Sequence, residues 1–304
     1  MESKPGAVAY GKPGIDAHPH SRLGDIVILS KLRVNALVVA TAVGGYYMAR
    51  PDPVDGGVIA WVSVGTALVA SGASAFNQIY ERRTDTLMAR TSGRPIAAGR
   101  MSPAQGAIVA AAFSAIGLAC LIWGANQMAA AVALATLVSY AAIYTPLKRR
   151  TSLSTVVGAV PGALPPLIGW AAAGGSLTGV APWSLFVLMF LWQLPHFLAI
   201  AWMFREDYAR AGMPMLTVVD KDGSITGRQT LLWAAALVPA SQLPFLFRIA
   251  SPTYAIGALV LGLAQLVLAF RFARHRSIAN ARALFYGSIV YLPLLWLLMA
   301  LGRP

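Results

Sequence analysis

Residues 57–95 read GVIAWVSVGTALVASGASAFNQIYERRTDTLMARTSGRP. The first part is a run of apolar and small residues, and a run of about 20 such residues crosses the hydrocarbon core of a bilayer as a helix. The second part carries an asparagine, two carboxylates and several arginines. The stretch therefore predicts a membrane-spanning helix that ends in a cluster of polar and charged side chains.

The composition of the whole chain agrees with a membrane protein. Of its 304 residues, 57% are hydrophobic and 12% are charged, whereas a soluble domain carries about 25% charged residues. A soluble globule of this size would lack the polar side chains to cover its surface. The single cysteine, Cys120, excludes a scaffold held together by disulfides. We therefore expect an all-α integral membrane protein.

Nine apolar stretches approach the length of a membrane span. The predicted transmembrane helices cover residues 26–49, 57–79, 104–123, 127–146, 153–173, 182–203, 229–248, 253–270 and 283–302. Residues 1–25 are polar and lack the apolar core of a signal peptide, so we interpret them as a disordered arm. Residues 26–304 then form one domain, a bundle of nine transmembrane helices.

The distribution of basic residues predicts the orientation of this bundle. The chain has 24 Lys+Arg against 11 Asp+Glu, a net charge of +13. With nine spans, all basic residues except Arg50, Arg248 and Arg303 fall on the side of the N-terminus. By the positive-inside rule the N-terminus is cytoplasmic and the C-terminus is external. In so apolar a chain, this charge indicates topology and anionic lipid or substrate rather than a nucleic-acid partner.

The polar segment that follows the second span has the pattern of a metal and phosphate site. Asn77, Glu81 and Asp85 are spaced by four residues, which places them on one face of a helix. Oxygen ligands of this kind suit Mg²⁺, and Arg90 and Arg94 follow closely enough to bind phosphate oxygens. The alternative is a solvated helix end in which Glu81 pairs with a neighbouring arginine.

Three further segments carry candidate residues. Glu206 and Asp207 follow the sixth span and form a second acidic group, or else an ordinary helix cap. Tyr144 and Lys148 end the fourth span, where a basic run also serves as a topology signal. His196 lies inside the sixth span and is a candidate contact for a porphyrin, a proton carrier or a structural histidine. The two acidic groups lie in the long loops expected on the cytoplasmic side, so we expect the site to open there.

Four segments in a fixed order resemble a known family. The pattern NxxxExxxDxxMxRTxxRPxxxG, from Asn77 to Gly99, is similar to the first signature of the UbiA-type intramembrane prenyltransferases. Three more segments resemble the branch of that family that farnesylates heme: YTPLKRRTSLSTVVGAVPGALPPLIGW (144–170), WQLPHFLAIAW (192–202) and EDYARAGMPMLTVV (206–219). The resemblance runs from about residue 30 to residue 301.

The resemblance implies a reaction and a role for each candidate residue. A farnesyl group would pass from farnesyl diphosphate to the 2-vinyl group of heme B, and water would complete the new side chain. Mg²⁺, the implied cofactor, would bind Asn77, Glu81, Asp85 and, from the second acidic motif, Asp207, which together form the catalytic set. Heme B is a substrate. The implied diphosphate ligands are Arg90, Arg94 and Lys148; the implied heme or prenyl contacts are Tyr144 and His196; and the candidate aromatic lining is Tyr80, Tyr140, Tyr144 and Trp192.

The same resemblance implies a place in the cell and leaves two alternatives open. We expect a multi-pass protein of the cell (inner) membrane, with a downstream heme A synthase or oxidase-assembly factor as partner. The alternatives are a prenyltransferase acting on a quinone precursor or another tetrapyrrole, and a cation-coupled secondary transporter. The sequence departs from the family pattern in having Glu81 where Asp is commoner, Leu32 where the heme branch often has Pro, and Met203 four residues before Asp207.

Overall fold

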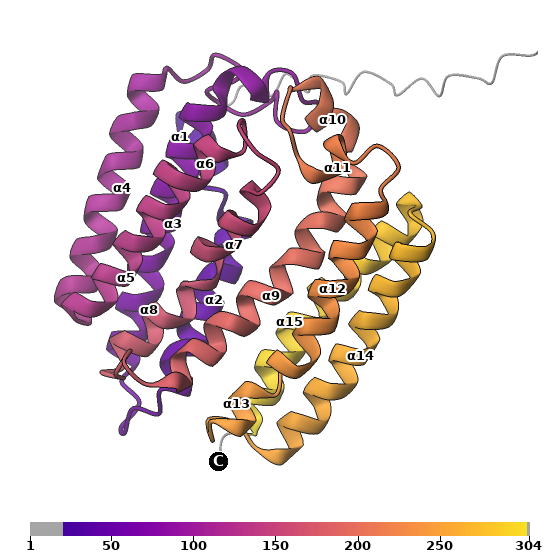
Figure 1. The fold of residues 1–304 in the computed structure, drawn as a ribbon. Coiled ribbons are helices and arrows are strands. Elements are labelled where there is room, and N and C mark those ends of the chain that lie inside the picture. The colour runs from indigo at the N-terminus through magenta and orange to yellow at the C-terminus, as the bar shows by residue number, and fades with distance from the viewer. Residues whose placement is uncertain (1–20, 303–304) are drawn as a thin grey trace, which may run out of the picture.

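The computed structural model describes residues 21–302 as a bundle of helices (Figure 1). The elements are α1 (Arg22–Ser30), α2 (Leu32–Met48), α3 (Gly56–Asp85), α4 (Pro103–Gly124), α5 (Gln127–Val138), the π-helix η1 (Ser139–Tyr144), α6 (Thr145–Leu147), α7 (Ser154–Ala163), α8 (Pro165–Ala172), α9 (Val180–Met203), α10 (Arg205–Arg210), α11 (Leu216–Val219), α12 (Ser224–Ala240), α13 (Leu243–Leu246), α14 (Pro252–Arg274) and α15 (Ile278–Leu301). The expected all-α architecture is confirmed.

The predicted N-terminal arm lies for the most part outside the described residues. Its last residues fold differently from the prediction, because α1 already begins at Arg22. The hydroxyl of Ser21 accepts a hydrogen bond from the backbone N–H of Gly24, at 3.0 Å, and so caps the first turn of that helix. The domain therefore starts several residues before the boundary at residue 26 that the apolar run alone suggested.

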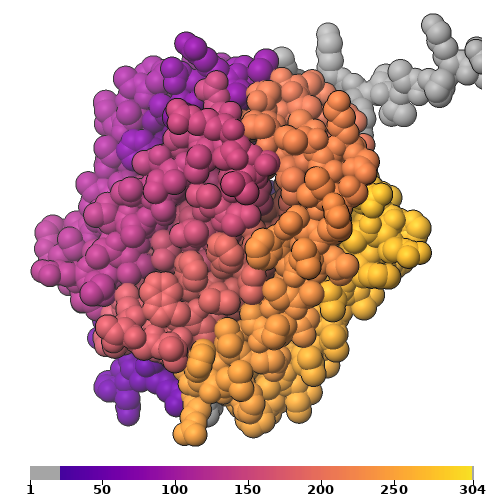
Figure 2. Space-filling model, in the orientation of Figure 1, coloured from indigo at the N-terminus to yellow at the C-terminus, as the bar shows by residue number. Residues whose placement is uncertain are grey.

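The long helices pack in the order in which they occur along the chain. α2 packs on α3, α3 on α4, and α4 on α5, and in the second half α9 packs on α12, α12 on α14 and α14 on α15. α15 then returns to contact both α9 and α2. In Figure 2 the indigo-to-magenta helices and the orange-to-yellow helices form two halves that meet along a seam. Residues of α2, α3, η1, α7 and α9 line a cavity.

Most of the predicted spans correspond to helices of sufficient length. Within residues 21–302, seven helical segments are long and apolar enough to cross a membrane, and the count becomes eight if α1 and α2 form one span bent by 46°. The bend is at Lys31, whose backbone has a left-handed conformation with φ 49°. The basic residue that interrupts the first apolar stretch therefore marks a break in the helix.

The seventh predicted span, residues 229–248, does not form one long helix. α12 begins earlier, at Ser224, and ends at Ala240, and the short α13 follows after two residues. A helix of 17 residues is about 26 Å long, somewhat less than the hydrocarbon core of about 30 Å. Pro239 falls in the last turn of α12, where the helix stops. Nine spans therefore remain a prediction.

Two glycines allow α2 and α8 to pack with their backbones in contact. A Cβ atom on Gly169 would overlap the carbonyl oxygen of Ala42, and a Cβ on Gly45 would overlap the carbonyl oxygen of Pro166. Side-chain packing against Ala42 and Ile168 completes this contact. Small residues commonly allow such close approach between membrane helices. The contact fixes α2, and with it one wall of the interior.

We expect Gly169→Ala to destabilise the protein by about 1–3 kcal/mol, because the added methyl group forces α2 and α8 apart. Thermal unfolding in detergent measures the loss. Gly179→Ala is the matched control, since nothing lies within 4 Å of a Cβ atom at that position. Equal stability of the two variants would contradict the proposed close contact.

The segments of the two long loops lie at the same end of the bundle. Figure 1 shows residues 86–102 together with α10 and α11 at the top, whereas α13 lies at the bottom. The backbone N–H of Ser251 donates to the carbonyl of Gly302, at 2.7 Å, which places the end of α15 beside the start of α14, at the end opposite α10 and α11.

The predicted orientation can be tested with topology reporters. A reporter inserted at Ser224 should report the cytoplasm, and one fused after Pro304 should report the external side. We expect this orientation because the nine-span arrangement places nearly all basic residues on the same side of the membrane as Ser224, and basic loops are retained in the cytoplasm. A reporter signal from the cytoplasm at both positions would contradict this orientation, because the chain would then cross the bilayer an even number of times between Ser224 and Pro304.

Candidate functional site

The last turns of α3 place three polar side chains in the interior. Asn77, Glu81 and Asp85 have exposed fractions of 1%, 2% and 0%. The spacing of four residues brings them to one side of the helix, as the sequence predicts. A solvated helix end is therefore the wrong interpretation of this segment, because all three side chains are buried.

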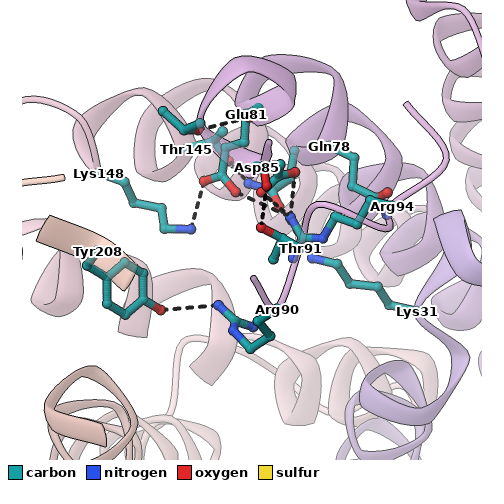
Figure 3. Close-up of polar contacts among 12 residues, drawn as sticks. Lys31, Gln78, Glu81, Asp85, Arg90, Thr91, Arg94, Thr145, Lys148 and Tyr208 are labelled. Atoms are coloured by element: carbon teal, nitrogen blue, oxygen red, sulfur yellow. Dashed lines mark hydrogen bonds and ion pairs between the residues drawn. The ribbon is translucent and has the colours of Figure 1, made fainter. Parts of the chain in front are cut away.

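Basic residues from two other segments compensate the buried carboxylates (Figure 3). Nη1 of Arg94 lies 2.9 and 2.8 Å from the two carboxylate oxygens of Asp85, and 3.7 Å from Oε2 of Glu81. Nζ of Lys148 donates to Oε1 of Glu81 at 2.7 Å. A buried carboxylate without such a partner would be costly. The pairing therefore ties the segments after α3 and α6 to the end of α3.

The environment of Lys148 keeps its side chain charged. Burial by itself lowers the pKa of Lys148, but the adjacent Glu81 carboxylate and neighbouring tyrosine hydroxyls raise it, and the net pKa lies above the ordinary value. The ammonium group also lies over the ring of Tyr144, 5.3 Å from its centroid, which favours the cation. Lys148 is thus a fixed positive charge at the site.

Lys31 is a site residue that the sequence analysis missed. Its ammonium group donates to Oδ1 of Asn77 at 3.3 Å, while Nδ2 of Asn77 donates to the hydroxyl of Thr145 at 3.3 Å. The signal was present in the sequence, because an ionisable residue that interrupts an apolar span is itself a reason to suspect a functional site.

Arg90 connects the two long loops. Its Nη2 donates to the hydroxyl of Tyr208 at 3.4 Å, and its guanidinium lies 5.4 Å from the ring centroid of Phe204. Met88, beside it in the chain, packs in an apolar cluster with Tyr208, Met213 and Met215. The two long loops therefore contact each other through Arg90 and Met88 on one side and Tyr208 on the other.

The second acidic motif makes local contacts within α10. Asp207 forms an ion pair with Arg210, three residues along α10, and Glu206 is exposed. Within residues 21–302, no three histidine, cysteine or acidic side chains lie close enough together to hold one metal ion. The carboxylate of Asp207 pairs with Arg210 of the same helix. The role of Asp207 as a metal ligand therefore stays a prediction.

A cavity of about 570 Å³ leads inward from the basic residues. Lys31, Arg90 and Arg94 lie in its wall, and Trp192, Gln193 and His196 of α9 line it as well. Tyr140 and Tyr144 also line it, both from η1, the π-helix that ends the long helix begun by α5. Tyr80, which is 39% exposed, is not among the lining residues. Three of the four proposed aromatic residues therefore belong to the lining.

The donor set of α3 fits a hard divalent cation. Asn77, Glu81 and Asp85 present one amide oxygen and two carboxylates from neighbouring helix turns, and Mg²⁺ prefers oxygen ligands. At present these oxygens accept hydrogen bonds from Lys31, Lys148 and Arg94. A cation bound by the same oxygens would compete with those contacts and leave the basic groups to bind an anionic ligand.

Comparison with known proteins agrees with this arrangement. Residues 37–298 match the model of the UbiA prenyltransferase family. The chain is 43% identical to the protoheme IX farnesyltransferase of Solibacter usitatus, over 92% of this chain and 99% of that protein. It is 39% identical to the protein of the same name from Koribacter versatilis, over 100% of this chain and 99% of that protein.

Solved structures share the fold. A digeranylgeranylglyceryl phosphate synthase superposes with a TM-score of 0.76 at 15% identity, over 92% of this chain and 98% of that one. The UbiA homologue of Aeropyrum pernix superposes with a TM-score of 0.70 at 19% identity, over 87% and 96%. The UbiA homologue of Archaeoglobus fulgidus, solved with GPP and Mg²⁺ bound, superposes at 0.64 with 14% identity, over 90% and 99%.

The ion pair between Arg94 and Asp85 gives a prediction about stability. The side chain of Asp85 is fully buried and that of Arg94 is 16% exposed. We expect Arg94→Ala to lower the free energy of unfolding by about 3 kcal/mol, because it leaves a buried carboxylate uncompensated. Denaturation in detergent measures this change.

The double variant Arg94→Ala/Asp85→Asn separates charge from packing. A neutral amide at position 85 removes the uncompensated charge, so the double variant should regain most of the stability lost in Arg94→Ala. If the two losses add instead, the Arg94 side chain contributes through packing and not through its pairing with Asp85.

Proposed function

Because the chain belongs to the UbiA prenyltransferase family, we propose that it transfers the farnesyl group of farnesyl diphosphate to the 2-vinyl group of heme B, giving heme O and diphosphate. The relatives named protoheme IX farnesyltransferase support this reaction, since they are about 40% identical over nearly the whole chain. The chain is thus an intramembrane prenyltransferase, a multi-pass membrane protein of the heme-farnesylating type.

The observation that best supports the proposal is a cluster of basic side chains beside a largely apolar cavity. Four basic side chains, those of Lys31, Arg90, Arg94 and Lys148, accompany two buried carboxylates. The positive surplus suits a ligand with a highly charged anionic head. The cavity continues from Lys31, Arg90 and Arg94 into a wall of apolar and aromatic side chains. An isoprenyl diphosphate has this combination of a charged head and a long apolar tail.

The basic residues act on the leaving group. When the allylic C–O bond of the donor breaks, the electron pair stays with the diphosphate, whose negative charge grows. Arg90, Arg94 and Lys148 are charged donors that stabilise this charge, and such preorganised contacts are a large part of catalysis. Lys31, held at the break between α1 and α2, is placed to do the same. These four residues bind and orient the diphosphate at one end of the cavity.

Asn77, Glu81 and Asp85 are the residues that would hold Mg²⁺, with Asp207 as a further candidate. When bound there, Mg²⁺ supplies Lewis-acid stabilisation of the departing diphosphate. The homologue from Archaeoglobus fulgidus, solved with GPP and Mg²⁺, supports this assignment by its fold. The position of Asn77, Glu81 and Asp85 at the end of α3 brings them beside the basic residues.

The aromatic wall suits the farnesyl cation. An allylic cation in water would be captured before it reached the vinyl group, so the reaction needs a pocket that excludes bulk solvent. Tyr140, Tyr144 and Trp192 line the cavity, and aromatic rings stabilise a nearby cation. Gly158 allows Tyr144 its position, because a Cβ atom there would overlap the tyrosine ring.

Arg90 and Arg94, which line the cavity, belong to the segment of residues 86–102 at one end of the bundle. By the positive-inside rule this end is cytoplasmic, so the water-soluble head of farnesyl diphosphate would enter from the cytoplasm. The bilayer supplies the apolar environment for heme B and for the farnesylated product. A heme A synthase or an oxidase-assembly factor in the same membrane would receive that product.

A reconstituted reaction tests the proposal. Purified protein is incubated with farnesyl diphosphate, heme B and Mg²⁺, and the hemes are separated by chromatography and identified by mass. We expect heme O and stoichiometric diphosphate. A parallel reaction with an aromatic quinone precursor in place of heme B is the control. Prenylation of the quinone precursor, with heme B unchanged, would contradict the proposed acceptor.

Asp85→Asn distinguishes a catalytic role of the carboxylate from an architectural one. We expect turnover to fall by about 10²–10³, the usual cost of losing one charge-stabilising contact in a transition state, with partial recovery at raised Mg²⁺. The fold should be retained, because asparagine still accepts a hydrogen bond from Arg94. Asn77→Ala should lower turnover less, since it removes a neutral ligand.

The control for this pair is Asp52→Asn, the same substitution at an exposed residue between α2 and α3. It should leave turnover unchanged. Full activity of Asp85→Asn would exclude this carboxylate from the catalytic machinery.

A further inference from the structure

Gln193 and His196 lie one turn apart on α9 and both line the cavity. We propose that their side chains hold the water molecule that adds to the farnesylated heme, and that His196 accepts the proton of this water. The inference rests on the proposed function and concerns its final step. The support for it is the set of hydrogen bonds that orient the two side chains. These bonds determine which atom of each side chain faces a ligand as a hydrogen-bond acceptor.

The hydrogen bonds around Ser288 fix the proton of His196. The hydroxyl of Ser288 lies 2.6 Å from the carbonyl oxygen of Phe285, and a carbonyl can only accept, so the single hydroxyl proton is used there. Nδ1 of His196 lies 2.7 Å from the same hydroxyl oxygen. That oxygen must therefore accept, and Nδ1 of His196 must carry the proton. In the neutral ring Nε2 is then unprotonated and accepts hydrogen bonds.

The ring of His196 is also held in place by stacking. Its centroid lies 5.1 Å from the ring of Trp192 and 5.0 Å from that of Phe285, with interplanar angles of 21° and 28°. The indole N–H of Trp192 donates to the backbone carbonyl of Ser288 at 2.9 Å. Residues 21–302 offer no hydrogen-bond partner to Nε2 of His196, which leaves this atom available at the cavity wall.

Gln193 is oriented by two backbone carbonyls. Its Nε2 lies 2.9 Å from the carbonyl oxygen of Met189 and 3.3 Å from that of Ala159. An oxygen in this position would face two other acceptors, so the nitrogen must be here and Oε1 must point the other way. Oε1 lies against Gly162, where a Cβ atom would overlap it, and Gly162 also lines the cavity. The amide therefore offers an acceptor to the cavity.

Oε1 of Gln193 and Nε2 of His196 both accept hydrogen bonds, so they favour a ligand that donates hydrogen bonds. Neither the diphosphate nor the farnesyl chain has a proton to donate, whereas water has two. In this step, C1 of farnesyl bonds to the terminal vinyl carbon and leaves a cation on the inner vinyl carbon beside the porphyrin. The water oxygen forms a bond to that carbon, and one of its protons passes to Nε2 of His196. The imidazolium returns this proton to solvent after product release.

The same cation has a second outcome that the two residues would suppress. Loss of a proton from the newly joined carbon chain gives an alkene, which is lighter than the hydroxylated product by one water molecule. A water held by Gln193 and His196 favours addition over this elimination. The ratio of the two products therefore reports on the two residues independently of the rate of farnesyl transfer.

His196→Phe tests the inference, because phenylalanine keeps the stacking with Trp192 and Phe285 and removes both nitrogens. With farnesyl diphosphate and heme B, we expect the ratio of hydroxylated to dehydrated product to fall at least about tenfold, as general-base effects do, whatever the change in the rate of diphosphate release. His275→Phe is the matched control, since His275 is exposed, and its products should be those of the parent. Mass spectrometry of the products gives the ratio.

Ser288→Ala provides a second variant that leaves His196 in place. Without the hydroxyl, the tautomer of His196 is no longer fixed, so we expect an intermediate product ratio. Unchanged product ratios in both variants, with farnesyl transfer intact, would overturn the inference. So would an optical spectrum in which heme B bound to the parent has a histidine-ligated iron that His196→Phe loses. Absence of any farnesylated heme from the parent protein would contradict the proposed function instead.

Discussion

The arrangement of the site depends on the neutralisation of two buried carboxylates at the end of a membrane helix. Glu81 and Asp85 are buried among apolar helices, where an unpaired charge would be prohibitively costly. Arg94 and Lys148 come from segments that follow α3 and α6, and their ion pairs bring these segments to one place. The break in the first span at Lys31 serves the same cluster, since its ammonium group reaches Asn77 on the same face of α3. The position of the site thus follows from electrostatics in a medium of low dielectric constant.

The basic residues at the site outnumber the two buried carboxylates whose charge they compensate. Arg90 has no carboxylate partner among the described residues and instead contacts Tyr208 and Phe204. The excess positive charge is stable only if an anion is present for part of the time, or if water reaches the basic groups. Together with the adjoining cavity, this excess suits a diphosphate that binds, reacts and leaves. The inner end of the cavity differs in character, because Gln193 and His196 are committed as acceptors there. The two ends of the cavity therefore serve different steps of one reaction.

Several features follow directly from local sequence. The apolar runs correspond to helices, and the spacing of Asn77, Glu81 and Asp85 places them on one side of α3, because helical periodicity is a property of neighbouring residues. The four motifs predict the family, to which the chain belongs. Apolar runs were less informative about where helices end. They placed a span at residues 229–248, whereas α12 begins at Ser224 and stops at Ala240, since capping groups and proline, rather than the apolar content of the segment, end a helix.

The sequence by itself determined the class of protein, the helix that carries the carboxylates and the chemistry of the site, because composition and periodicity are encoded residue by residue. The tertiary structure decided which cation pairs with which carboxylate, that Lys31 and Tyr208 belong to the site, and that Asp207 pairs with Arg210. It also decided that Tyr80 is exposed while Tyr140 and Tyr144 line the cavity. These outcomes depend on contacts between residues far apart in the chain, and their distances are set by how whole helices pack.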